Sequence, residues 1–172
     1  AVGQGSDEAS FLIHLIYKPK AKPVKRIALV GKGVTFDSGG LSLKPSQHME
    51  DMKIDMAGAA AMLAVFTALQ ELAPDIEGHG IAALCENMPS GKAVRPGDVV
   101  KTMSGKTIEI LNTDAEGRVT LADSLHCAAK LDPDYLIDLA TLTGACMVAL
   151  GQEVAGLMSN NDSLAKKLSD AA

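Results

Sequence analysis

The chain has 172 residues, of which 47% are hydrophobic and 22% are charged, and its formal net charge is −5. This length suits one domain with a single core, and the charges are spread without a basic block, which argues against nucleic-acid binding. Three widely spaced cysteines in apolar runs predict reduced thiols of an intracellular protein. No uninterrupted apolar run reaches about 18 residues and no signal-peptide pattern opens the chain, so we expect a cytoplasmic protein without a membrane span.

The first half of the chain predicts two strands and a long helix. Phe11–Tyr17 is an apolar run typical of a strand, and its His14 is better explained as a satisfied strand histidine than as a ligand. Arg26–Gly31 is continuously apolar, as expected of a central strand buried on both faces. The polar, glycine-rich stretch Lys32–Lys53 predicts a loop, and the Ala-, Met- and Leu-rich stretch Ile54–Leu72 predicts a helix.

The second half continues the alternation of strands and helices. We expect strands at Gly78–Glu86, Tyr135–Leu139 and Val154–Met158, a loop at Asn87–Gly97, a β-hairpin of Asp98–Met103 with Thr107–Leu111, and helices at Val119–Ala129 and Ser163–Ala171. This order predicts an α/β fold with a mostly parallel sheet and an antiparallel hairpin.

The segment Asn112–Arg118 (NTDAEGR) places two carboxylates and a guanidinium within five residues. In an extended segment Asp114 and Glu116 would project to the same side, where their oxygens could bind a cation, and Arg118 would suit an anion. A helix N-terminus, with both acids favoured by the helix dipole and the arginine solvated, explains the pattern equally well.

A second polar segment, Gly31–Gly40 (GKGVTFDSGG), follows the predicted buried strand. It matches neither the dinucleotide-binding glycine pattern nor a P-loop, which argues against a nucleotide-binding domain. Gly39 and Gly40 predict a sharp turn or a close backbone approach. Lys32 and Asp37 would then lie at the mouth of the sheet, although a surface lysine and a turn aspartate are the simpler interpretation.

A third acidic position, Asp55, opens the predicted helix. It could cap that helix, but Asp51 could serve the same purpose and leave Asp55 free for another role. Gly58, near the start of the helix, suggests close packing against a neighbouring backbone. Four converging carboxylates (Asp37, Asp55, Asp114 and Glu116) would repel one another unless cations neutralised them, which favours two bridged divalent metals. A buried lysine could add a neutral amine ligand.

Taken together, GKGVTFDSGG, KIDMAGAAAM, NTDAEGRVTLAD and DLATLTGA, in this order, resemble the M17 leucine aminopeptidase (cytosol aminopeptidase) family. The resemblance implies a three-layer α/β/α, zinc-exopeptidase-like fold with a mixed, mostly parallel central sheet. It also implies that residues 1–172 are a partial catalytic domain, truncated at both ends, without the family's N-terminal domain and the C-terminal part of the catalytic domain. The activity implied is that of a dizinc metallo-aminopeptidase that removes an N-terminal residue, preferably leucine or another apolar one, by attack of a metal-bridged hydroxide.

The same resemblance implies roles for individual residues. It makes Asp37 and Glu116 ligands of both metals, Asp114 a ligand of one, and Lys32 with Asp55 ligands of the other, exchange-resistant one. The remaining roles are carbonyl polarisation by Lys44, bicarbonate binding by Arg118, and substrate binding by Met52, Asn112, Thr141, Leu142 and Gly144.

The cofactors implied are two divalent ions, zinc or, at the exchangeable site, manganese, magnesium or cobalt. The partners implied are peptide substrates and, for the full-length protein, a homohexamer. The alternative is a non-catalytic metal-binding or scaffold fragment of the same fold. That alternative predicts the loss of a metal ligand, of Lys44 or of Arg118, and all of them are present.

Overall fold

The computed structural model describes residues 1–172, which form two compact units, Ala1–Thr141 and Leu142–Ala172. The first unit contains the central sheet and the helices that cover it, and the second contains two helices joined by irregular chain. Each unit is described by itself.

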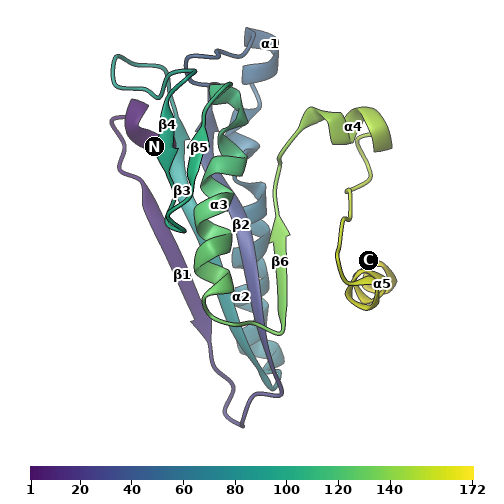
Figure 1. Ribbon diagram of the computed structural model, residues 1–172. Coiled ribbons are helices and arrows are strands. Elements are labelled where there is room, and N and C mark those ends of the chain that lie inside the picture. The colour runs from purple at the N-terminus through teal and green to yellow at the C-terminus, as the bar shows by residue number, and fades with distance from the viewer. The chain divides into compact units, whose positions relative to one another are not determined.

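The central sheet has four strands in the order β1-β3-β2-β6 (Figure 1). Its strands are β1 (Phe11–Tyr17), β2 (Lys25–Asp37), β3 (Ile76–Asn87) and β6 (Tyr135–Leu139). β2 pairs in parallel with both β3 and β6, whereas β1 pairs antiparallel with β3 and forms one edge of the sheet. The prediction of a mixed, mostly parallel sheet is confirmed.

Two helices, α2 (Ala57–Leu72) and α3 (Glu116–Ala129), cover opposite faces of this sheet (Figure 1). Successive side chains of a strand point to opposite faces, so each central strand supplies both cores. Ala28 and Val30 of β2 pack in one core with Leu121 and Ala128 of α3. Leu29 belongs to the other core, with α2 residues including Met62. The three-layer α/β/α architecture is therefore confirmed.

Strand β2 is longer than predicted, because it continues through Lys32–Asp37, which we expected to be loop. β3 pairs with it as far as Asp37 opposite Asn87, with a register irregularity between Val34 and Phe36. The glycines suggested a loop, but Gly31 is required by helix packing: a Cβ there would lie 2.5 Å from the Cα of Ala59 in α2. The predicted close approach at Gly58 is also confirmed, since a Cβ there would overlap the carbonyl of Leu139.

The predicted hairpin forms, but as a separate two-stranded sheet of β4 (Val99–Lys101) and β5 (Thr107–Glu109). Gly105, with φ +85°, lies in the turn between them. Short helical segments complete the first unit: η1 (Val2–Gly5), α1 (Ser46–Met49), η2 (Met52–Ile54) and η3 (Thr113–Ala115).

The second unit contains α4 (Gly144–Leu150) and α5 (Asp162–Ala171). The predicted strand Val154–Met158 is wrong, because this segment has no partner strand and its Val154 and Met158 are 56% and 89% exposed. A strand needs inter-strand hydrogen bonds that local sequence cannot supply. The helix α4 was not predicted. Its N-cap is Thr143, whose hydroxyl accepts a hydrogen bond from Ala145 N.

One segment, Ser46–Leu72, contains an 18-residue window apolar enough to cross a membrane, with a mean hydropathy of 1.5. Charged residues interrupt this segment, so it contains no uninterrupted apolar run of about 18 residues. In the structure the segment is divided among α1, η2 and α2, and Ala59 and Met62 are buried against the sheet. A helix of a protein core can have the same composition, and one side of α2 packs on the sheet in this way.

Candidate metal centre

Three buried carboxylates meet at the carboxyl end of β2. Asp37 ends that strand, Asp55 follows η2, and Glu116 is the first residue of α3. One oxygen from each of these residues lies within 4.8 Å of an oxygen from each of the others. Because the connections of a parallel sheet begin at the carboxyl ends of its strands, residues from three distant segments are brought to one point there.

The ammonium group of Lys32 lies among these carboxylates. Its Nζ is 2.7 Å from Asp55 Oδ1 and 2.8 Å from Glu116 Oε1, and it donates to the Thr141 carbonyl at 2.8 Å. Only 3% of the Lys32 side chain is exposed. Burial opposes its charge, but the two carboxylates outweigh burial and raise the pKa of Lys32. Lys32 therefore lies among the acids, and the two carboxylates favour its ammonium form.

A second lysine, Lys44, links Asp37 to the NTDAEGR segment. Its Nζ is 3.0 Å from Asp37 Oδ2 and 2.6 Å from Asp114 Oδ1. Burial opposes the charge of Lys44 as well, and hydrogen bonds to Asp114 and Asp37 raise its pKa nonetheless. The four carboxylates are thus held by two ammonium groups, one for each pair.

The two ammonium groups do not balance the negative charge of the four carboxylates. Burial raises the pKa of Glu116 to about 7, and it also raises the pKa of Asp55. Oδ2 of Asp55 is buried and accepts no hydrogen bond. A buried carboxylate oxygen without a donor is costly unless a cation satisfies it, so this oxygen marks a free ligand position.

The extended segment assumed for the NTDAEGR motif is wrong. Asp114 lies in the 3-10 turn η3, and Glu116 begins α3 directly after it. The two carboxylates consequently reach different lysines, Asp114 pairing with Lys44 and Glu116 with Lys32. The motif is both a helix N-terminus and part of the acidic cluster, so the two alternative interpretations of the motif are compatible.

Asp55 does not cap the long helix. The N-cap of α2 is Met56, and no side chain caps this helix. Asp51 precedes η2 and makes no capping hydrogen bond either. Instead, Asp55 Oδ1 accepts hydrogen bonds from Lys32 Nζ at 2.7 Å and from Thr141 Oγ1 at 2.9 Å.

Asn87, which sequence reasoning missed, holds Asp37 in place. Its Nδ2 donates to Asp37 Oδ1 at 2.8 Å and to the Thr113 carbonyl at 3.0 Å, and the residue is 5% exposed. Thr113 in turn exchanges hydrogen bonds with Ser42, of 2.7 and 3.1 Å. A polar residue just beyond a predicted buried strand was the available signal, because strand ends in parallel sheets carry functional groups.

The predicted turn at Gly39 and Gly40 is confirmed. Their φ angles are +87° and +65°, a region that glycine enters without steric cost. A Cβ on Gly39 would lie 2.9 Å from Asp114 Oδ1, so the turn brings the backbone close to the cluster.

Of the other residues expected at the site, Thr141 contacts the cluster directly, through its carbonyl and hydroxyl groups. Asn112 is exposed, and its side chain accepts a hydrogen bond from Asp114 N. Met52 is half-buried in η2, and Arg118 is exposed, with no hydrogen bond or ion pair to the cluster. Leu142 and Gly144 belong to the second unit.

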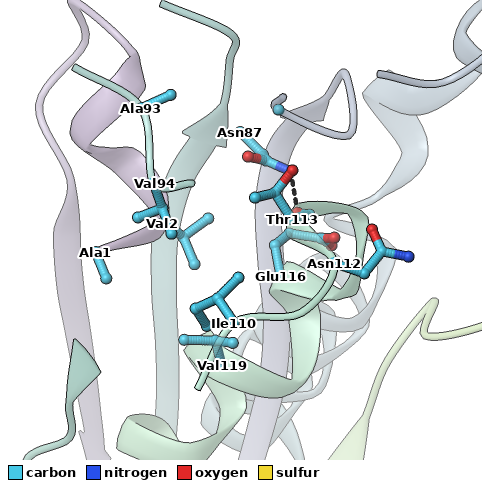
Figure 2. A pocket seen from close by; sticks show the side chains of 11 residues that line it. Ala1, Val2, Asn87, Ala93, Val94, Ile110, Asn112, Thr113, Glu116 and Val119 are labelled. Atoms are coloured by element: carbon cyan, nitrogen blue, oxygen red, sulfur yellow. Dashed lines mark hydrogen bonds between the residues drawn. The ribbon is translucent and has the colours of Figure 1, made fainter. Parts of the chain in front are cut away.

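A small cavity of about 20 Å³ adjoins the cluster and has room for about one water molecule (Figure 2). Apolar side chains including Val2, Ile110 and Val119 line one side of it. Asn87 and Glu116 line the other, and the hydrogen bond from Asn87 to Thr113 is visible there. This apolar lining explains why Glu116 is poorly solvated.

Comparison with known proteins identifies the family. The sequence model of the catalytic domain of the cytosol aminopeptidase family matches residues 1–172. The chain belongs to the cytosol aminopeptidase family. It is 56% identical to a probable cytosol aminopeptidase of Aquifex aeolicus over 172 residues, and 58% identical to one of Prochlorococcus marinus over 174 residues. Each comparison covers 100% of this chain and 35% of the relative.

The chain thus spans about a third of the length of these relatives. The relatives are named aminopeptidases, and the buried carboxylates of this chain provide a group that could bind a metal. The three cysteines, Cys85, Cys127 and Cys146, are free, in agreement with the expectation of reduced thiols.

Proposed function

We propose that this chain carries the dimetal centre of an aminopeptidase that removes the N-terminal residue of peptides, with leucine or another apolar residue preferred. The observation that carries the proposal is the convergence of Asp37, Asp55 and Glu116, all buried and within 4.8 Å of one another. The family of the chain supports the reaction class, and the names of the relatives support a cytoplasmic location.

The residues present fit a pair of divalent ions. The proposed ligands are Lys32, Asp37, Asp55, Asp114 and Glu116, with Asp37 and Glu116 shared between the ions. The unsatisfied Oδ2 of Asp55 is available, and a set of oxygens with one amine suits zinc, manganese, magnesium or cobalt. The two ions, when bound, would polarise a peptide carbonyl and lower the pKa of a water molecule.

The lysines have distinct roles in this proposal. Lys32 now donates to Asp55 and Glu116, so it must lose a proton before its amine can act as a ligand. Lys44 is 14% exposed, and its ammonium can donate a hydrogen bond to an oxygen on which negative charge develops. Arg118 is exposed and can hold an anion such as bicarbonate near the N-terminus of α3.

We further propose that Met52, Asn112, Thr141, Leu142 and Gly144 contact the peptide, and that the full-length protein forms a hexamer. Residues 1–172 would be part of a larger catalytic domain. The alternative is a fragment that binds metal without turnover, and the observation that favours it is that the chain covers 35% of the length of its relatives.

The test combines metal content with hydrolysis of leucine-p-nitroanilide by the purified chain after addition of Zn²⁺ and Mn²⁺. We expect about two equivalents of metal, and both metal binding and hydrolysis should be lost in Asp37→Asn and Glu116→Gln. Asp7→Asn changes an exposed carboxylate and is the matched control. Two equivalents without turnover would favour the non-catalytic alternative, and no metal in the unsubstituted chain would overturn the proposal for this chain.

A further inference from the structure

Two histidines meet on the surface of the central sheet, at its β1 edge. His14 of β1 and His79 of β3 face each other, with His14 Nε2 2.9 Å from His79 Nδ1 and ring centroids 5.2 Å apart. The register explains the meeting: His14 pairs with Ile81 and His79 pairs with Ile16, so the histidines are diagonal neighbours on one face. That face is the one covered by α3 over the central strands, because Ile81 packs in its core.

A carboxylate fixes the proton of His79. The Nε2 of His79 lies 3.3 Å from Glu77 Oε1, and the guanidinium of Arg26 holds Glu77 Oε2 from Nε at 3.1 Å and Nη2 at 3.0 Å. An imidazole that donates from Nε2 to a carboxylate presents an unprotonated Nδ1, and this Nδ1 faces His14. Carboxylates orient metal-binding histidines in the same way.

His14 can present its own lone pair to the same point. The residue is exposed, and no protein group hydrogen-bonds to its Nδ1, so that nitrogen can carry the proton toward solvent. In the structure the 2.9 Å contact is a hydrogen bond, in which His14 Nε2 donates to His79 Nδ1. A metal ion would take the place of this proton, and the proton of His14 would move to its Nδ1. His79 is 5% exposed, so an ion would approach from the side of His14.

We propose that His14 and His79 form a binding site for a nitrogen-preferring divalent metal, such as zinc, copper or nickel, separate from the acidic cluster. Imidazole suits these metals, whereas the carboxylates at the other site also accept magnesium and manganese. Zinc–nitrogen bonds of about 2.0–2.1 Å in a tetrahedral site place two nitrogens roughly 3.3 Å apart. The present 2.9 Å therefore requires a small movement, which the exposed ring of His14 can make. Water would complete the coordination shell.

The surroundings bear on the affinity of the site. Burial lowers the pKa of His79, which keeps its imidazole neutral and able to bind near neutral pH. The nearby charges are those of Glu77, which favours a cation, and Arg26, which opposes it. A bound ion would join the edge strand β1 to β3 through side chains, in addition to their backbone hydrogen bonds.

The test follows the ring signals of the four histidines by NMR while Zn²⁺ is added to the purified chain. We expect the signals of His14 and His79 to shift or broaden together, with no such response from His48 and His126. His14→Gln should abolish the response of His79, and His48→Gln, which changes an exposed histidine, should leave it intact. Because each signal is residue-specific, metal in the acidic cluster is not mistaken for this site.

Copper provides a second measurement. Bound Cu²⁺ should show nitrogen hyperfine coupling from two imidazoles by electron paramagnetic resonance, lost in both His14→Gln and His79→Gln. The proposal is overturned if the signals of His14 and His79 are unaffected by zinc, or if all four histidines respond equally. Failure of the acidic cluster to bind metal would leave this result unchanged.

Discussion

At the scale of single residues, each buried carboxylate of the cluster depends on a specific donor. Asp37 is the clearest case, because its Oδ1 accepts from Gly39 N and Asn87 Nδ2 while its Oδ2 meets Lys44. Asn87 is 5% exposed and also satisfies the Thr113 carbonyl. Removal of its amide would leave two buried acceptors with fewer donors.

We therefore predict that Asn87→Ala lowers the free energy of unfolding by about 1–3 kcal/mol, measured by urea denaturation. It should also weaken metal binding by roughly 10–100-fold, because Asp37 loses the group that orients it. Asn160→Ala, at an exposed position of the second unit, should change stability by less than about 0.5 kcal/mol. Unchanged metal affinity in Asn87→Ala would show that Asp37 is held adequately without it.

At the scale of elements, the position of α2 is set by glycines. Gly58 approaches the carbonyl of Leu139 in β6, and a Cβ there would also lie 2.9 Å from Lys32 N. These contacts are with backbone, which cannot rotate away, so a larger residue must move the whole helix.

Gly58→Ala should therefore destabilise the chain by at least about 1 kcal/mol, even though alanine is favoured over glycine in a helix by a similar amount. The measurement is the midpoint of urea unfolding. Gly91→Ala is the matched control, because a Cβ at Gly91 meets nothing within 4 Å. Equal stability of the two variants would contradict the close packing of α2 on the sheet.

The pairing of β1 with β3 should depend on pH through His79. Burial lowers its pKa below the ordinary 6.5, and the hydrogen bond to Glu77 only partly opposes this. As the pH falls below about 6.5 the unfolded chain takes up the proton first. The stability contributed by a neutral His79 is thus complete above that pH and is lost as the pH falls toward the lower, folded-state pKa.

In the presence of EDTA, the unfolding free energy of the unsubstituted chain should decrease below pH 6.5 relative to that of His79→Gln. The difference in slope should be at most about 1.4 kcal/mol per pH unit, the value for one proton. His48→Gln should follow the unsubstituted chain. Parallel curves for the unsubstituted chain and His79→Gln would refute the prediction.

At the scale of the whole molecule, metal binding and folding should be coupled, because Asp37, Asp55 and Glu116 converge only in the folded chain. At a free metal concentration about 100 times the dissociation constant, one site adds about 2.7 kcal/mol of stability. For a chain of this size, this corresponds to a rise in Tm of roughly 5–10 °C.

We expect that rise on addition of Mn²⁺ to metal-free chain, measured by thermal unfolding followed by circular dichroism. Manganese prefers oxygen ligands, so the two histidines should contribute little. Asp37→Asn should remove the rise, whereas Asp7→Asn should keep it. A rise of equal size in Asp37→Asn would place the stabilising ion elsewhere.

The sequence by itself determined the α/β class, the bounds of the strands Phe11–Tyr17 and Tyr135–Leu139, and the identity of the acidic residues. These follow from local hydrophobic pattern and from residue chemistry. The tertiary structure decided where β2 ends, because its glycines are explained by packing against α2. It also decided that Val154–Met158 is not a strand, because strand pairing depends on distant partners.

The same division holds at the site. The sequence motifs predicted the ligand candidates Lys32, Asp37, Asp55, Asp114 and Glu116. Only the fold shows that Lys32 and Lys44 each pair with two different carboxylates. Neither the contact of Asn87 with Asp37 nor the pairing of His14 with His79 could be predicted from local sequence. Both depend on strand register, which brings together residues 50 and 65 positions apart through backbone hydrogen bonds that no local pattern encodes.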